Sequence, residues 1–262
     1  MKRSGSTSLR DAGAPPRRAF SLAMAAIAAV AGHGNARALD ACTAASTRSV
    51  APVVELYTSE GCNSCPPADR WLSRLKADPT VVALAFHVDY WDRLGWKDRF
   101  ASAAFTAHQA AQQSSNGARF SYTPQVVVDG RDRTDWSRAT VTSPARPLAA
   151  VDVAVTHQGD RFVATVTPAA GAPQRFAAYW AVTEQGHVTA VKAGENEGVT
   201  LQHDFVVRDY EPVAAWAARS GAAATFSFKP TTAADAAHPR SVNLVVVDAA
   251  TGRPVQAVRV AC

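Results

Sequence analysis

Two cysteines three positions apart, Cys62 and Cys65, are the residues of this sequence whose type and spacing best fit a chemical task. They follow an apolar run that predicts a strand over 53–58, and they precede a segment that predicts a helix from Pro66. The first turn of a helix leaves N–H groups unpaired and carries a partial positive charge, and both favour a thiolate. Such a dithiol can exchange with disulfides, with an exposed Cys62 attacking and Cys65 resolving the mixed disulfide.

The neighbouring segments supply the elements that position this motif. The predicted helix runs from Pro66 to Lys76, and the helical spacing of its apolar residues turns Trp71, Leu72 and Leu75 toward a sheet. A second continuous apolar run at 81–86 predicts another buried strand. A helix that links two such strands makes them parallel. A further helix is predicted from Phe100 to Gln113.

The run from Tyr57 to Cys65 resembles the redox motif of thioredoxin-like proteins. It is closer to glutaredoxins, because Gly61 stands where thioredoxins proper carry a tryptophan. Thioredoxins also carry a buried acid at the position that Leu56 occupies here. Glu55 is adjacent, but strand alternation turns it to the opposite face, so the sequence does not support a carboxylate proton relay from that strand.

Thr123-Pro124 lies directly before a third predicted strand, Gln125–Val128. The same resemblance implies a cis-proline that faces the dithiol, with the backbone of Thr123 binding the client chain. The alternative is an ordinary trans proline at the start of a strand. Asp129-Gly130 then predicts a tight turn and a fourth, antiparallel strand within 131–136.

Longer stretches resemble one exported, thioredoxin-like family, known as domain of unknown function 1223. The resemblance covers most of the chain after the first 38 residues and implies a thioredoxin-like fold and export, with no assigned substrate. Its motifs are Leu56–Cys62, Pro66–Asp69, Phe86–Asp92, Gly95–Asp98, Tyr122–Gln125, Gly194–Asn196 and Val206–Asp209.

The pattern changes after Pro144 and Pro147 to short alternating runs separated by turn residues, which is typical of an antiparallel sandwich. We therefore predict an α/β thioredoxin-like domain at 39–148, with a central mixed sheet and flanking helices. An antiparallel β-sandwich-like region is predicted at 149–262.

Residues 1–38 predict an export signal. Arg17-Arg18 precede an apolar stretch that ends in Ala36-Arg37-Ala38, a small-residue cleavage pattern. The pair fits either a twin-arginine signal or the ordinary secretory route. This segment holds six of the 27 basic residues and one of the 22 acidic ones, so the remainder is formally neutral. We expect a periplasmic or secreted protein with no membrane span in the mature chain and no nucleic-acid partner.

Export favours disulfides. If Cys62 and Cys65 pair with each other, Cys42 and Cys262 remain, and a structural disulfide between them would tie the two ends of the mature chain together. Either could instead be free or bridge two chains.

Other polar residues have weaker claims to the site. His87 follows the second strand and is a candidate to stabilise the Cys62 thiolate, or to join Asp89 and Asp92 in metal binding or proton transfer. The alternative is that this loop packs over the fold and caps the next helix. Asp69 and Arg70 are expected to be solvated. Three residues of the predicted β region have no partner nearby in the sequence: Glu195, Asn196 and Arg208. Arg208 is expected either to pair with Glu195 or to hold a loop.

The sequence thus predicts an exported thiol–disulfide oxidoreductase that acts on protein or small-molecule disulfides without a cofactor or resident metal. One alternative is a copper or zinc carrier that uses the reduced cysteines, with His87 as a further ligand. Another is a binding protein in which Cys62–Cys65 is an inert structural bridge.

Overall fold

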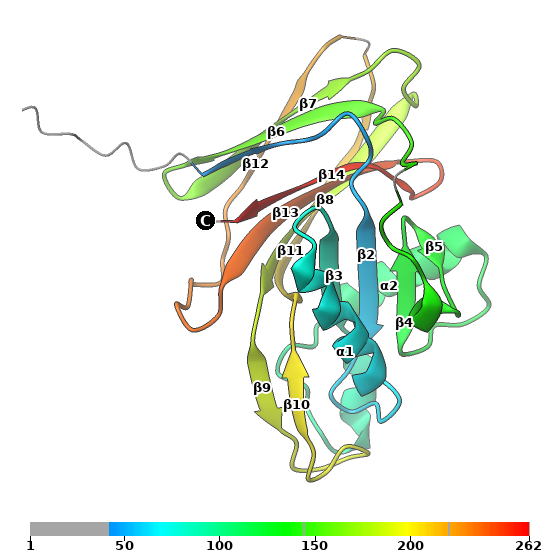
Figure 1. The fold of residues 1–262 in the computed structure, drawn as a ribbon, viewed down its shortest axis with the longest axis vertical. Helices are drawn as coiled ribbons and strands as arrows, with labels where there is room; N and C mark the ends of the chain where they lie inside the picture. The colour runs from blue at the N-terminus through cyan, green and yellow to red at the C-terminus, as the bar shows by residue number, and fades with distance from the viewer. Residues whose placement is uncertain (1–41, 144, 220, 262) are drawn as a thin grey trace, which may run out of the picture. The chain divides into compact units, whose positions relative to one another are not determined.

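The structure is a computed structural model that describes residues 42–143, 145–219 and 221–261 (Figure 1). Within these ranges the chain forms two α-helices, α1 (Pro66–Ser73) and α2 (Ala103–Asn116). Three short 3₁₀ helices cover Arg74–Ala77, Asp89–Leu94 and Trp136–Arg138. The other regular elements are strands.

The largest sheet has eight strands in the order β14–β13–β8–β11–β3–β2–β4–β5. Its only parallel neighbours among the described residues are β2 with β3 and β3 with β11. The strands are β2 (Val53–Thr58), β3 (Val82–His87), β4 (Gln125–Val128), β5 (Arg131–Asp132), β8 (Arg175–Glu184), β11 (Val206–Ala217), β13 (Arg240–Asp248) and β14 (Pro254–Ala261).

A second sheet has four antiparallel strands in the order β1–β6–β7–β12. It packs over one end of the large sheet, and Trp180 and Phe228 stack across the core between them. A separate pair, β9 and β10, forms a hairpin beside α1 (Figure 1). The bounds are β1 (Thr43–Ala45), β6 (Val151–Gln158), β7 (Arg161–Pro168), β12 (Ala224–Phe228), β9 (His187–Ala190) and β10 (Thr200–His203).

The predicted α/β thioredoxin-like fold with flanking helices is wrong. The described chain is mostly strand, arranged in three sheets with few helices. The reason is long-range strand pairing. β3 is not an edge strand, because β11 from the far half of the chain pairs with it and places Val206 opposite Ala85. Sheet edges with unpaired N–H and C=O groups recruit further strands in this way. Strands from both sides of residue 148 therefore share one sheet, and the division into 39–148 and 149–262 stays a prediction.

The local predictions near the cysteines agree with the structure. β2 and β3 are parallel and wholly buried, and α1 begins at Pro66, where a missing N–H costs nothing. Asp129 and Gly130 form the two-residue turn between β4 and β5, with φ of 51° and 72°. Positive φ at both positions is what a tight hairpin turn requires. The alternating strands after Pro147 also form, as β6, β7 and the strands that follow.

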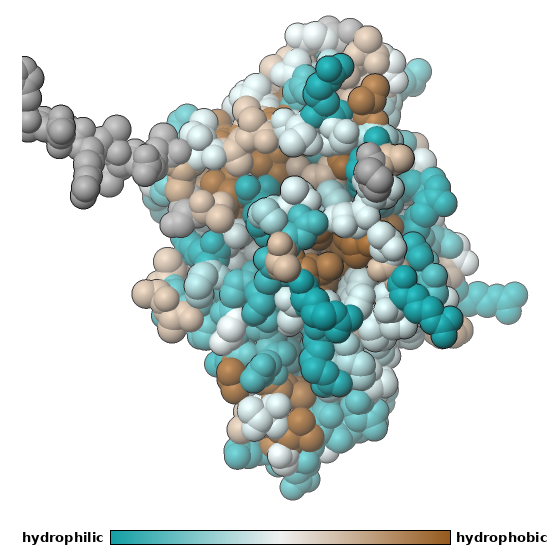
Figure 2. All heavy atoms as spheres, viewed as in Figure 1, coloured by the Kyte–Doolittle hydropathy of each residue, from teal (hydrophilic) through white to brown (hydrophobic). Residues whose placement is uncertain are grey.

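Polar and apolar side chains are mixed on the face shown in Figure 2, and one of its apolar areas lies at the lower end, in the region of β9 and β10. Val188 and Val199 of this hairpin are exposed. Across the described ranges, no helix has the length and apolar character needed to cross a membrane.

Two predictions fall outside the described residues. The export signal at 1–38 is one, and the pairing of Cys42 with Cys262 is the other, because Cys262 is not described. Cys42 directly precedes β1 and packs against the core between the two larger sheets. Its backbone carbonyl accepts a hydrogen bond from His157.

Candidate functional site

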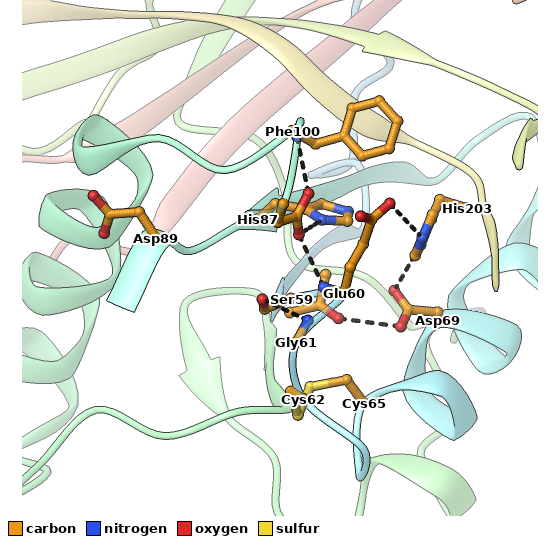
Figure 3. Close-up of polar contacts among 12 residues, drawn as sticks. Ser59, Glu60, Gly61, Cys62, Cys65, Asp69, His87, Asp89, Phe100 and His203 are labelled. Carbon is orange, nitrogen blue, oxygen red and sulfur yellow. Dashed lines mark hydrogen bonds and ion pairs between the residues drawn. A yellow bond between two sulfur atoms is a disulfide. The ribbon is translucent and has the colours of Figure 1, made fainter. Parts of the chain in front are cut away.

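Cys62 and Cys65 form a disulfide between the end of β2 and the start of α1, with their Cα atoms 5.4 Å apart (Figure 3). A turn from Ser59 to Cys62 leads into the motif. Cys65 occupies the N-cap position of α1, and its carbonyl accepts hydrogen bonds from Ala68 and Asp69. The predicted place of the motif at a strand–helix junction is thus confirmed.

The exposure expected of Cys62 is not found. Both cysteines have an exposed fraction of 0 %, although Asn63 and Ser64 between them are exposed. The Sγ atom of Cys62 lies 3.4 Å from the Ser64 hydroxyl. The sequence could not reveal this burial, because burial is set by how distant parts of the chain pack around the motif.

Gly194, Glu195 and Asn196, in the loop between β9 and β10, form a clasp over the motif. The Asn196 side-chain amide donates to the carbonyls of Glu60, at 2.8 Å, and Cys62, at 3.0 Å. Glu195 accepts a hydrogen bond from the backbone N–H of Asn63 at 3.2 Å. The sequence motif that contains Glu195 and Asn196 therefore belongs to the site.

Gly194 allows the clasp to approach. Its φ is +78°, and a Cβ at this position would stand 3.3 Å from Cβ of Trp96. Trp96 in turn donates its indole N–H to Glu60 at 2.8 Å. A larger residue at 194 would therefore strain the backbone and push the clasp away from the cysteine motif.

Trp91 links Thr123 and Pro124 to the cysteine motif. The Thr123–Pro124 bond is cis, which confirms the prediction. The indole N–H of Trp91 donates to the Thr123 hydroxyl at 2.8 Å, and a Cβ built on Gly61 would stand 3.1 Å from Cβ of Trp91. The tryptophan thus lies between Gly61 and Thr123. A role of Thr123 in client binding stays a prediction.

His87 is wholly buried at the end of β3, and its Nδ1 lies 2.6 Å from Asp98. The same Asp98 oxygen accepts the N–H of Glu60 at 2.9 Å. Burial raises the pKa of Asp98, but His87 and the surrounding hydrogen bonds outweigh it and hold the pKa below its usual value. His87 therefore acts on the turn before Cys62 through Asp98 and Glu60.

A second buried histidine, His203, comes from β10 and lies between two carboxylates (Figure 3). Its Nε2 is 3.5 Å from Glu60, and its Nδ1 is 3.8 Å from Asp69. Burial lowers the pKa of His203, but Asp69 and Glu60 outweigh it and raise the pKa to about 9. Burial likewise raises the pKa of Glu60, but His203 and other donors lower it overall. A buried cation thus pairs with an anion two residues before Cys62.

Asp69 was expected to be solvated, and this is wrong. Its exposed fraction is 7 %, and it accepts a hydrogen bond from the Thr58 hydroxyl at 3.1 Å. Neighbouring Arg70 is exposed, as expected. A carboxylate in the first turn of a helix is usually read as a surface residue, and only the approach of β10 encloses this one.

The grouping of His87 with Asp89 and Asp92 does not form. Asp89 points away from His87 (Figure 3) and binds the hydroxyl of Thr106 in α2. Asp92 accepts the N–H of Asp98. Among the described residues, no group of three or more histidine, cysteine, aspartate or glutamate side chains is arranged to hold a metal ion. The loop contacts α2 through Asp89, but it does not cap the helix: the N-cap is Ser102, whose side chain accepts the N–H of Ala104.

Two further predictions concern residues away from the disulfide. Arg208 pairs with Glu184 at 2.7 Å rather than with Glu195. Glu55 faces away from α1, as strand alternation predicts, and is buried among hydrogen-bond partners on the other side of the sheet. These are Tyr57, His108, Gln112 and Tyr179.

Fold and site together define a β-rich protein with a buried two-cysteine bridge, whose backbone is bound by a clasp from the far half of the chain. The model of one family matches residues 53–247, and the chain belongs to this family, DUF1223, described as proteins of unknown function.

Two solved structures share the fold. Protein AGR_C_4864 from Agrobacterium tumefaciens is 24% identical, with a TM-score of 0.61 over 82% of this chain and 96% of that one. HBP35 of Porphyromonas gingivalis is 14% identical, with a TM-score of 0.58 over 82% of this chain and 76% of that one. No curated protein matches the chain significantly.

Proposed function

We propose that this protein is an exported thiol–disulfide oxidoreductase that uses Cys62 and Cys65 on thiol- or disulfide-containing clients. One observation carries the proposal: buried ionisable side chains, His203 with Glu60 and Asp69, flank the cysteine motif. Burying charges opposes folding unless they are paired, and shifted pKa values concentrate at functional sites.

The chemistry follows from the position of the two cysteines. When the protein acts as a reductant, the Cys62 thiolate attacks a client disulfide, forming a mixed disulfide and releasing one client thiolate. The Cys65 thiolate then attacks Cys62, which closes the Cys62–Cys65 bond and releases the second client thiolate. Two electrons pass to the client, whose thiolates take protons from the solvent. Run backwards, the same steps oxidise a dithiol client.

Client access requires a local opening around the disulfide, because neither cysteine is exposed. The backbone of Thr123 is the proposed client-binding group, reached through Trp91. The N-terminal segment supports export, and an oxidising compartment suits either direction of exchange.

The test is a pair of serine variants in the exported protein. Cys62→Ser should abolish exchange with a dithiol or disulfide probe, whereas Cys65→Ser should trap a covalent mixed disulfide, seen as a reducible adduct by mass spectrometry. Full exchange activity in Cys62→Ser would contradict the mechanism.

The complete burial of both sulfurs favours one other function, in which the bridge is structural and the protein only binds its partner. The reduction potential separates the two. A value well below about −300 mV would mark a bridge that the thiol pool does not open, and a higher value would mark an exchanging one.

A further inference from the structure

Glu195 lies closer to the chemistry than its place in the sequence suggests. Its carboxylate accepts the N–H of Asn63, the peptide group bonded directly to Cys62. The two residues are 132 positions apart, and only the clasp brings them together. The Glu195 side chain is exposed.

α1 begins with Pro66 and Pro67, which have no N–H, so a thiolate on Cys62 depends on donors from the turn before the helix, and the N–H of Asn63 belongs to that turn. The Glu195 carboxylate occupies this N–H and places a like charge on the peptide group that follows Cys62. Both effects disfavour the ionised thiol.

We propose that Glu195 is a positioning residue of the dithiol. The Glu195 carboxylate holds the N–H of Asn63 and thereby disfavours the thiolate of Cys62 in the reduced protein. This inference rests on the proposed function, because the ionisation of Cys62 matters only if the cysteines exchange with a client. The effect of Glu195 on that ionisation can be measured without a client. Because a stabilised thiolate stabilises the reduced form, Glu195 also makes the disulfide a weaker oxidant.

The test uses Glu195→Gln, which keeps an oxygen acceptor for Asn63 and removes the charge. In a Cys65→Ser background, where Cys62 is the one thiol of the motif, thiolate formation is followed by ultraviolet absorbance against pH. We expect Glu195→Gln to shift the titration to lower pH, with about threefold more thiolate below the midpoint. The difference should shrink in high salt, because Glu195 is exposed.

Glu197→Gln is the matched control, since Glu197 is exposed two residues further along the same loop. It should titrate as the parent does. An unchanged titration in Glu195→Gln, or an equal shift in Glu197→Gln, overturns the inference.

With both cysteines present, Glu195→Gln should also move the equilibrium with glutathione about threefold toward the reduced protein. Failure of the proposed function is seen separately: a wild-type protein that exchanges with no thiol probe contradicts the oxidoreductase, whatever the titration shows.

Discussion

At the scale of single residues, the buried carboxylates differ in the groups that compensate for their burial. Glu55 is surrounded by hydrogen-bond partners, with Tyr179 and Gln112 donating to it. Glu60 and Asp69 share one histidine, His203. Removing one partner of a buried ion pair leaves an uncompensated charge, which is among the most destabilising changes in a protein core. His203 is therefore the side chain on which the charge balance beside the cysteines depends.

His203 should make the stability of the oxidised protein depend on pH. Its folded-state pKa of about 9 lies above the unfolded value, so the native state binds the proton more tightly. This stabilisation is complete below about pH 6.5 and is lost as the pH rises through about 9, a change on the order of 3 kcal/mol. Denaturant unfolding across this range should show the fall in the wild-type protein.

In His203→Gln the same measurement should give a lower and flatter profile, because the titrating cation is gone while Glu60 and Asp69 remain buried. A variant that keeps the wild-type slope between pH 6.5 and 9 would assign the dependence to another group.

At the scale of elements, the β9–β10 hairpin contacts the cysteine motif and its neighbours through both its loop and β10. Its loop carries the clasp, which binds the carbonyl of Cys62, and β10 places His203 between Glu60 and Asp69. Most residues from 192 to 199 are exposed. Loops with few buried contacts are the segments that open locally without global unfolding. We therefore expect the clasp to open while the sheet stays folded.

Asn196→Ala should speed the reduction of the Cys62–Cys65 bond by a small dithiol. It removes the two hydrogen bonds that tie the clasp to Glu60 and Cys62. At about 1 kcal/mol each, their loss should raise the rate roughly tenfold or more. The rate is measured by quenching with an alkylating agent and counting modified cysteines by mass spectrometry.

Gln202→Ala, an exposed position of β10 in the same hairpin, is the control and should leave the rate unchanged. Equal rates in Asn196→Ala and the wild-type protein would mean that the sulfurs are reached by a route other than the clasp.

At the scale of the whole molecule, one eight-stranded sheet joins the cysteine motif to the last strands of the chain. β3 lies inside this sheet and all six of its residues are buried. Its neighbour β11 also pairs with β8, so the first strands depend on the later ones. Stability near the cysteines is therefore a property of the whole sheet.

A fragment of residues 39–148 should not fold alone. Without β11, the apolar β3 becomes an open edge, and without the β9–β10 hairpin Asp69 and Glu60 lose His203. Circular dichroism should show no cooperative thermal transition for the fragment, whereas residues 39–262 should melt cooperatively. A cooperative transition in the fragment would support an independent domain with the predicted boundary.

Much of the local structure could be predicted, because it depends on neighbours in the sequence. The apolar run of β2, Pro66 at the start of α1 and the Asp129-Gly130 turn all form as expected. The fold class could not be predicted. Strand pairing between Ala85 and Val206 depends on which strand edges meet in space. The alternation of apolar and polar residues predicts a strand, but it does not predict which strand will pair with it.

The sequence by itself determined where the two cysteines lie in the local structure, because consecutive residues specify a strand, a turn and a helix that begins with proline. Only the tertiary structure decided their surroundings. Asp69 became a buried acid and Glu195 a neighbour of Cys62 because the β9–β10 hairpin folds back on α1. Charge and burial depend on distances through space, and residues more than 130 positions apart carry no local signal of such a meeting.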